Sequence, residues 1–198
     1  LLVSFFHIFQ DCLSEQMSIS PSVARLHQLC ATIPYTFVAR VKADGEQVLK
    51  HYPSLSAATA PIPGDPYGKQ AVSLVGTVPI SFRGSEYNIP VQLWFVQAYP
   101  SSYPLAFVAP TPSMMVKPGH QHVDSSGRCY FPYLSNWRKE ASNMIGLINE
   151  MIRAFSLDPP VRERPTLPSS SPPPSPSPPP LAPSSPSPIS PPPPRPTY

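Results

Sequence analysis

The 198-residue chain carries a formal net charge of +3, and its 14 basic residues do not cluster along the sequence. Without a basic cluster to neutralise phosphates, the charge distribution gives no support for nucleic-acid binding. The three cysteines, Cys12, Cys30 and Cys129, have unrelated spacings that give neither a zinc-ligand pattern nor a disulfide framework. We therefore expect a reducing compartment, with no metal and no cofactor.

The prolines divide the chain into a foldable part and a tail, because 19 of the 33 fall in residues 159–198. Proline lacks an amide proton and has a fixed φ, so we predict that residues 162–198 form a disordered, polyproline II-like linker. Its Ser-Pro runs also resemble hydroxyproline-rich wall glycoproteins, which leaves a structural wall protein as an alternative. The folded domain is predicted over 21–161.

The sequence of residues 1–20 predicts no function for this segment. The apolar run 1-LLVSFFHIF-9 is too short to cross a membrane, and it lacks the basic start of a signal peptide. We expect no direct membrane span.

Two helices and a turn are predicted before the first strand. Residues 21–31 place apolar side chains at helical spacing after Ser20-Pro21, in the manner of a capped start. A second helix is predicted over 43–52, although Gly45 weakens it. The prolines and glycines of residues 60–70 predict a turn or hairpin tip.

An antiparallel meander is predicted in the middle of the chain. Short loops (81–86 and 97–104) separate three stretches rich in β-branched and aromatic residues: 71–80, 87–96 and 105–109. Pro79 and Pro90 should lie at strand edges or ends, because each removes a ladder donor.

The clearest helix is predicted over 142–155. Its apolar residues recur at i, i+3, i+4 and i+7, Ser142 and Asn143 are good caps, and Asp158-Pro159 stops it. Helices around a meander describe an α+β domain with one core.

Five ordered motifs carry a family resemblance: 87-YNIP-90, 98-AYP-100, 107-FVAPTPSM-114, 122-HVD-124 and 131-FPYL-134. Together they resemble a ubiquitin-conjugating enzyme variant (UEV) domain of the tumour-susceptibility/vacuolar-sorting subunit family of ESCRT-I. The resemblance implies a ubiquitin-conjugating-enzyme-like fold, in which helices pack on a four-stranded antiparallel meander.

The same resemblance implies a non-catalytic sorting module. This family binds ubiquitin and P-(T/S)-A-P peptides and sorts ubiquitinated cargo into multivesicular bodies. A cytoplasmic, endosome-associated protein is therefore expected, with other ESCRT-I subunits as partners of a full-length form. A second possibility is a non-catalytic partner of a ubiquitin-conjugating enzyme in ubiquitin chain building, as other UEV proteins are.

Cys129 is predicted not to be a nucleophile. Active ubiquitin-conjugating enzymes carry their cysteine three residues after a glycine, and that position here, counted from Gly127, is Tyr130. Neighbouring side chains of an extended segment point to opposite faces, so Cys129 should face away from the inactive-nucleophile position of Tyr130. Asp124 stands near the place of the oxyanion-stabilising asparagine, where its charge would be repulsive. We expect no enzyme activity.

A metal site at His120, His122 and Asp124 is the weaker reading of that segment. The three residues alternate, so an extended chain would place them on one face. Two histidines and a carboxylate in a loop are weak evidence, and a structural or solvated role is favoured.

The positions that match the family's peptide groove offer rings, an adaptable thioether wall and polar groups: Thr77, Phe82, Tyr87, Asn88, Met114, Pro159 and Val161. There are two departures from the family pattern. Phe82 replaces a tyrosine and loses its hydroxyl, and Arg162-Glu163 replaces a phenylalanine and a serine. The far wall of the groove is therefore expected to be shorter or charged.

The positions that match the family's ubiquitin surface are Ile62 and Asp65 on the first hairpin, with Trp94 and Phe107 on the sheet. Gly64 falls where an asparagine is expected. For Trp94, a purely structural core position stays open, because a large ring in a strand is often buried. A small interface of this type is expected to bind weakly.

Overall fold

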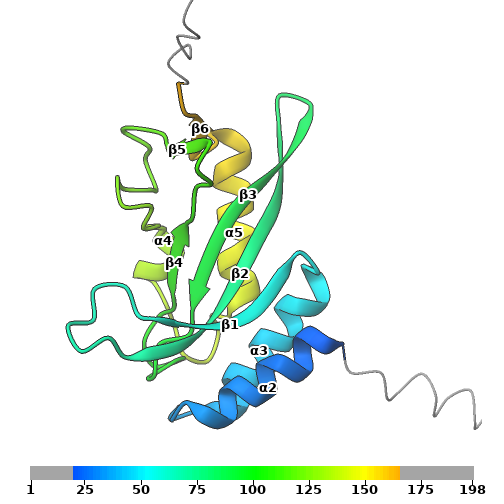
Figure 1. Ribbon diagram of the computed structural model, residues 1–198, viewed down its shortest axis with the longest axis vertical. Helices are drawn as coiled ribbons and strands as arrows, with labels where there is room; N and C mark the ends of the chain where they lie inside the picture. Colours follow the sequence, from blue (N-terminus) through cyan, green and yellow to red (C-terminus); the bar gives the residue numbers. More distant parts are fainter. Residues whose placement is uncertain (1–19, 166–198) are drawn as a thin grey trace, which may run out of the picture. The chain divides into compact units, whose positions relative to one another are not determined.

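The computed structural model describes residues 20–165, which form four helices and six strands (Figure 1). In chain order these are α2 (Pro21–Thr32), α3 (Val38–His51), β1 (Leu55–Pro61), β2 (Gln70–Phe82), β3 (Ser85–Trp94), β4 (Leu105–Val108), β5 (Met114–Val116), α4 (Pro132–Ser135), α5 (Met144–Leu157) and β6 (Val161–Glu163). Within this range, no helix combines the length and apolarity needed to cross a bilayer.

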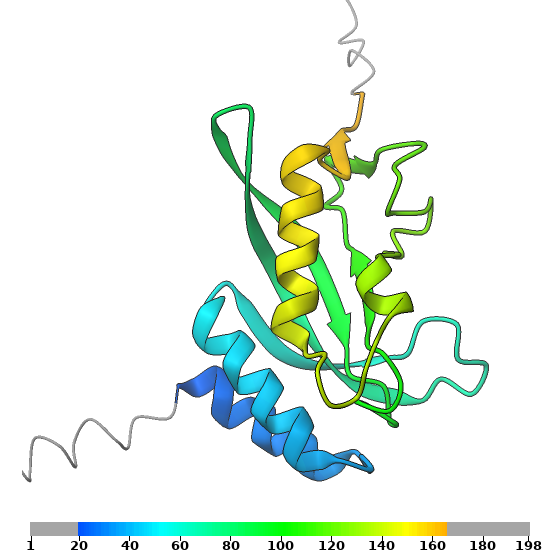
Figure 2. The same ribbon diagram turned by 180° about the vertical axis from the view of Figure 1, so that it is seen from behind.

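The predicted α+β meander is confirmed. Strands β1, β2, β3 and β4 follow one another in an antiparallel sheet, and α5 covers one face of it (Figures 1 and 2). Alternate β2 residues (Leu74, Val78 and Ile80) are buried in the core together with the apolar stripe of α5. The side chains buried at alternate strand positions and the apolar stripe of α5 thus form one core.

The prolines in β2 and β3 lie where each strand pairs with a neighbour on one side only. Pro79 falls beyond Gly76, where pairing with β1 ends, and Pro90 falls just before Val91, where pairing with β4 begins. The expected position at strand edges is therefore correct, although both prolines are inside the strand bounds.

Helix α3 begins at Val38, five residues before the predicted start, and continues through Gly45. A Cβ at Gly45 would lie 2.6 Å from Leu26 Cδ2 on α2, so glycine lets the two helices approach closely. This packing against α2 offsets the low helix propensity of glycine. The local sequence of α3 carries no information about this contact.

A buried carboxylate ties α3 to the loops around it. Arg40 Nε donates to both oxygens of Asp44 at 2.9 Å, and the buried Tyr99 hydroxyl donates to Asp44 Oδ2. Arg40 Nη2 also donates to the Ser142 carbonyl at 2.9 Å. The side chain of Asp44 is 7 % exposed and that of Arg40 is 32 % exposed, so the carboxylate is shielded from water while the guanidinium keeps part of its hydration.

The loop predicted over 81–86 is wrong, because the strands continue almost to each other. Phe82 pairs with Ser85, and only Arg83 and Gly84 form the turn. Both have positive φ, 52° and 81°, as the two central residues of a type I′ hairpin require. Glycine adopts this conformation easily, whereas arginine does so at a steric cost.

Regular structure continues past residue 161, the predicted end of the folded domain. Strand β6 pairs antiparallel with β5, and the backbone amide of Arg164 donates to the Ser113 carbonyl at 2.8 Å. Arg162 and Glu163, which the predicted boundary places in the tail, belong to this two-stranded ladder. The N-terminal segment 1–19, including Cys12, and the predicted tail from 166 onward lie outside the described residues.

Candidate binding surfaces

Cys129 is a buried structural residue. Its side chain is 2 % exposed, and its backbone amide donates to the Ala106 carbonyl at 2.8 Å. Burial raises the pKa of the thiol to about 12, so the group is protonated at neutral pH. A protonated, enclosed thiol cannot act as the nucleophile of a transfer reaction.

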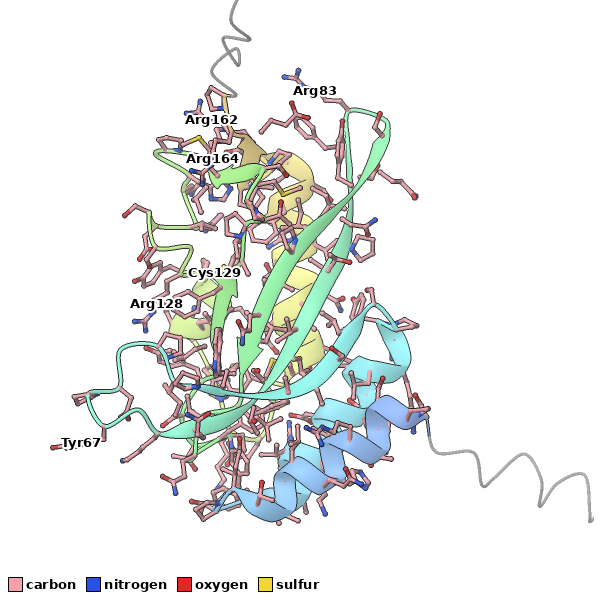
Figure 3. All side chains as sticks on the ribbon, in the orientation of Figure 1. Tyr67, Arg83, Arg128, Cys129, Arg162 and Arg164 are labelled. Carbon is pink, nitrogen blue, oxygen red and sulfur yellow. The ribbon has the colours of Figure 1, made fainter. Side chains whose placement is uncertain are left out.

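Tyr130 occupies the other side of the same segment and is 51 % exposed. The Arg128 guanidinium lies 5.4 Å from its ring centroid, and its hydroxyl donates to Asp124 Oδ2 at 3.1 Å. Cys129 (labelled in Figure 3) is buried and Tyr130 is half-exposed. The two side chains therefore lie on opposite faces of the segment, as the alternation of an extended chain predicts.

Asp124 organises the turn that leads into this segment. Its Oδ1 accepts hydrogen bonds from the Ser126 hydroxyl at 2.6 Å, the Ser126 amide at 2.9 Å and the Arg128 amide at 3.0 Å. These bonds, led by the one from the Ser126 hydroxyl, lower the pKa of the carboxyl. The carboxylate thus accepts the hydrogen bonds that close this turn, and it offers no hydrogen-bond donor that could stabilise an oxyanion.

The histidines of this region are engaged in the fold. His120 Nε2 is 2.9 Å from the Asp158 carbonyl, and its Nδ1 accepts from the His122 amide at 3.1 Å. Both ring nitrogens of His120 are therefore engaged by groups of the fold. His122 stacks on Phe131 with the centroids 5.0 Å apart. The part of the chain described here contains no cluster of metal-ligating side chains.

A groove of about 500 Å³ lies between the β2–β3 hairpin and the β5–β6 ladder. Six of the seven predicted peptide-binding residues line it: Phe82, Tyr87, Asn88, Met114, Pro159 and Val161. They come from segments up to 79 positions apart in the chain, and the fold brings them together. Tyr87 is 48 % exposed, so much of its surface is free for a ligand.

Thr77 is the predicted groove residue that does not line this cavity. It pairs with Pro90 in the middle of the sheet, and its carbonyl accepts from the Ser54 hydroxyl at 2.7 Å. The register therefore places Thr77 farther from the hairpin tip than Phe82 and Tyr87.

The far end of the groove is charged. Arg162 and Glu163 are both exposed and line the cavity, as does Glu86, which sequence reasoning missed. Register places Glu163 directly opposite Met114, so the departure from the family pattern falls at the groove wall itself. The Arg83 guanidinium, at the hairpin tip in Figure 3, lies 5.0 Å from the Phe82 ring centroid.

A second candidate surface surrounds the loop between β1 and β2, residues 62–69, which we name the tongue. The tongue projects away from the sheet, at the end of β2 opposite to the hairpin tip (Figure 1). Ile62 and Asp65 are half-buried within it. The Asp65 carboxylate accepts from the Tyr67 amide at 2.8 Å, so its predicted contact role coexists with a structural one.

Trp94 and Phe107 lie on the sheet with their rings in edge contact, 5.3 Å between centroids. Trp94 is only 6 % exposed, whereas Phe107 is half-buried. The indole Nε1 of Trp94 is enclosed and has no hydrogen-bond partner among the described residues. Phe107 is thus the member of this pair that is accessible to a ligand, and the buried Trp94 packs against its ring.

Comparisons with known proteins agree with this architecture. The family model of the UEV domain matches residues 27–163. The human tumor susceptibility gene 101 protein is 44 % identical over 109 residues, which cover 55 % of this chain and 27 % of the relative. The chain thus spans about a quarter of the length of that curated relative.

Two solved yeast structures share the fold. The vps23 UEV domain in complex with a vps27 PSDP peptide is 22 % identical, with a TM-score of 0.59 over 71 % of this chain and 94 % of its own. The Vps23 UEV in a complex with ubiquitin is 23 % identical, with a TM-score of 0.53 over 68 % and 94 %. With the family model covering more than half of the sequence, the chain belongs to the UEV domain family.

Proposed function

We propose that this chain is a non-catalytic binding module of ESCRT-I that sorts ubiquitinated cargo into multivesicular bodies. One surface, built around the tongue and Phe107, binds ubiquitin. The other, the groove between the β2–β3 hairpin and the β5–β6 ladder, binds P-(T/S)-A-P peptides. The protein would act in the cytoplasm at the endosomal surface, with other ESCRT-I subunits as partners of a full-length form.

The groove is the observation that carries this proposal. Seven positions of the chain match the family's peptide groove, and six of the seven line one cavity of about 500 Å³. A proline-rich ligand is already extended, so an aromatic and apolar groove captures it at a small entropic cost. Asn88 at the same cavity offers an amide that can fix the register of the ligand.

The solved relatives support both ligand classes, because one vps23 UEV domain was solved with a PSDP peptide and another with ubiquitin. The absence of catalysis is supported by the buried, protonated Cys129 and by the exposed Tyr130 at the inactive-nucleophile position. A chain with this site would carry or present ubiquitin without forming a thioester with it.

The proposal is tested by titrating the isotopically labelled 198-residue chain with ubiquitin and, separately, with a P-T-A-P peptide while recording amide NMR spectra. Ubiquitin should shift Ile62, Asp65 and Phe107, and the peptide should shift Tyr87 and Met114. A peptide with both prolines replaced by alanine is the matched control and should shift neither set.

Each result has a distinct meaning. Two separate sets of shifts support the two-site module. Shifts with ubiquitin alone mean that the charged groove end has changed the peptide specificity. A folded chain that responds to neither ligand contradicts the proposed function as a whole.

A further inference from the structure

Tyr67, at the end of the tongue, is the most exposed large apolar side chain of the described residues, at 84 % (Figure 3). Nothing in the family motifs of this chain singles it out. The Lys69 ammonium lies 6.0 Å from its ring centroid, at the outer limit of a cation–π contact. A large ring held in water at a loop tip gains nothing for folding, and contact with a partner would remove its apolar area from water.

The loop that carries Tyr67 is held by its own hydrogen bonds. The Ile62 amide donates to the Lys69 carbonyl at 2.8 Å and closes the base of the tongue. Inside the loop, the Tyr67 amide donates to Asp65 Oδ1 at 2.8 Å, and the Gly68 amide donates to the Asp65 carbonyl at 3.2 Å. The tyrosine is therefore presented from a fixed backbone, which lowers the entropy cost of binding through its ring.

We propose that Tyr67 is an anchor of the ubiquitin-binding surface, beside Ile62 and Asp65; this inference rests on the function proposed above. Ubiquitin presents an apolar patch ringed by polar groups, and tyrosine matches both parts with an apolar ring and a hydroxyl. Gly64 stands where the family pattern has an asparagine, so the tongue of this chain lacks that amide side chain. Tyr67 supplies a larger contact three residues later.

Geometry separates Tyr67 from the peptide groove. The tongue precedes β2, whereas Phe82 at the far end of this 13-residue strand lines the groove. A short peptide seated in the groove therefore cannot reach the tongue. Ubiquitin, a folded partner that also meets Phe107 on the sheet, can do so.

The experiment measures the affinity of the full chain for labelled ubiquitin by fluorescence anisotropy, for wild type, Tyr67→Ala and Tyr67→Phe. Tyr67→Ala should weaken binding about fivefold or more, since aromatic anchors contribute at that level. Tyr67→Phe keeps the ring and should stay within about threefold of wild type. Leu157→Ala is the matched control, because Leu157 is 79 % exposed at the end of α5 far from the tongue.

Affinity for a P-T-A-P peptide is measured in the same samples and should be unchanged, which shows that the variants remain folded. Wild-type binding of ubiquitin, with Tyr67→Ala within twofold of it, overturns the anchor and leaves the proposed function standing. Equal losses in Tyr67→Ala and Leu157→Ala also overturn it. A wild-type chain that does not bind ubiquitin removes the proposed function itself and the anchor with it.

Discussion

The buried thiol of Cys129 predicts a reactivity that can be measured directly. Burial raises its pKa from the ordinary value of 9.0 to about 12, a difference of three pH units. At neutral pH the thiolate fraction is therefore about 1,000-fold lower than that of a free cysteine. Because the thiolate is the reacting species, alkylation of Cys129 should be slower by at least this factor.

The assay is a time course of iodoacetamide labelling of the native chain, read at single residues by peptide mapping and mass spectrometry. Cys30 is the internal control, because its burial raises the pKa only to about 11. Ionisation alone thus slows Cys30 by about 100-fold, and Cys30 should react faster than Cys129. Between pH 7 and 9 the rate at Cys129 should rise about tenfold per unit without a plateau, since deprotonation is still far from complete.

Unfolding the chain in urea should bring both thiols to the rate of a free cysteine. A native Cys129 that reacts within tenfold of that rate, or whose pH profile levels off below pH 9, would contradict the raised pKa of its thiol. A ubiquitin thioester on Cys129, formed with activating enzyme and ATP and lost in a Cys129→Ser variant, would also contradict it.

Three further predictions concern the groove and the fold. Tyr87→Ala should weaken P-T-A-P peptide binding about tenfold in fluorescence anisotropy, with ubiquitin binding unchanged, because a half-exposed ring at the groove loses its contact. Asp44→Ala should lower the free energy of unfolding in urea by about 2–3 kcal/mol, because the buried Tyr99 hydroxyl and the partly exposed Arg40 lose their shared acceptor. A loss below about 1 kcal/mol would show that this pair is not a stabilising element. Asn143→Ala should cost about 1 kcal/mol in the same assay, because the Asn143 side chain caps α5 by accepting from the Gly146 amide at 2.8 Å, and an unchanged midpoint would argue against the cap.

The elements that the sequence predicts well are those with their own periodic signal. Strands β2 to β4 and helix α5 carry enough alternation or helical spacing to be placed without any tertiary knowledge. The three-residue strands β5 and β6 have no such signal. They exist because residues 45 to 49 positions apart pair with each other, which local patterns do not encode.

The candidate sites divide in a similar way. The groove residues follow from family motifs, and the fold gathers six of them. Glu86 was missed because it belongs to no motif and becomes a lining residue only through the tight turn at Arg83 and Gly84. The exposure of Tyr67 agrees with the turn predicted over 60–70, whereas the burial of Trp94 is set by three-dimensional packing, since strand-like sequence does not tell which of its aromatic side chains is covered.

The length of β2 has a consequence for any partner that carries both a ubiquitin and a proline motif. Thirteen strand residues at about 3.3 Å each separate the tongue from the groove by up to about 40 Å. A fully extended linker covers about 3.4 Å per residue, so roughly 12 residues bridge the tongue and the groove on one molecule. Phe107 pairs with Gln92 and lies nearer to the groove, so a spacer that starts from that side of the ubiquitin surface can be shorter. Under the function proposed above, spacer length would then select between one-to-one binding and clustering.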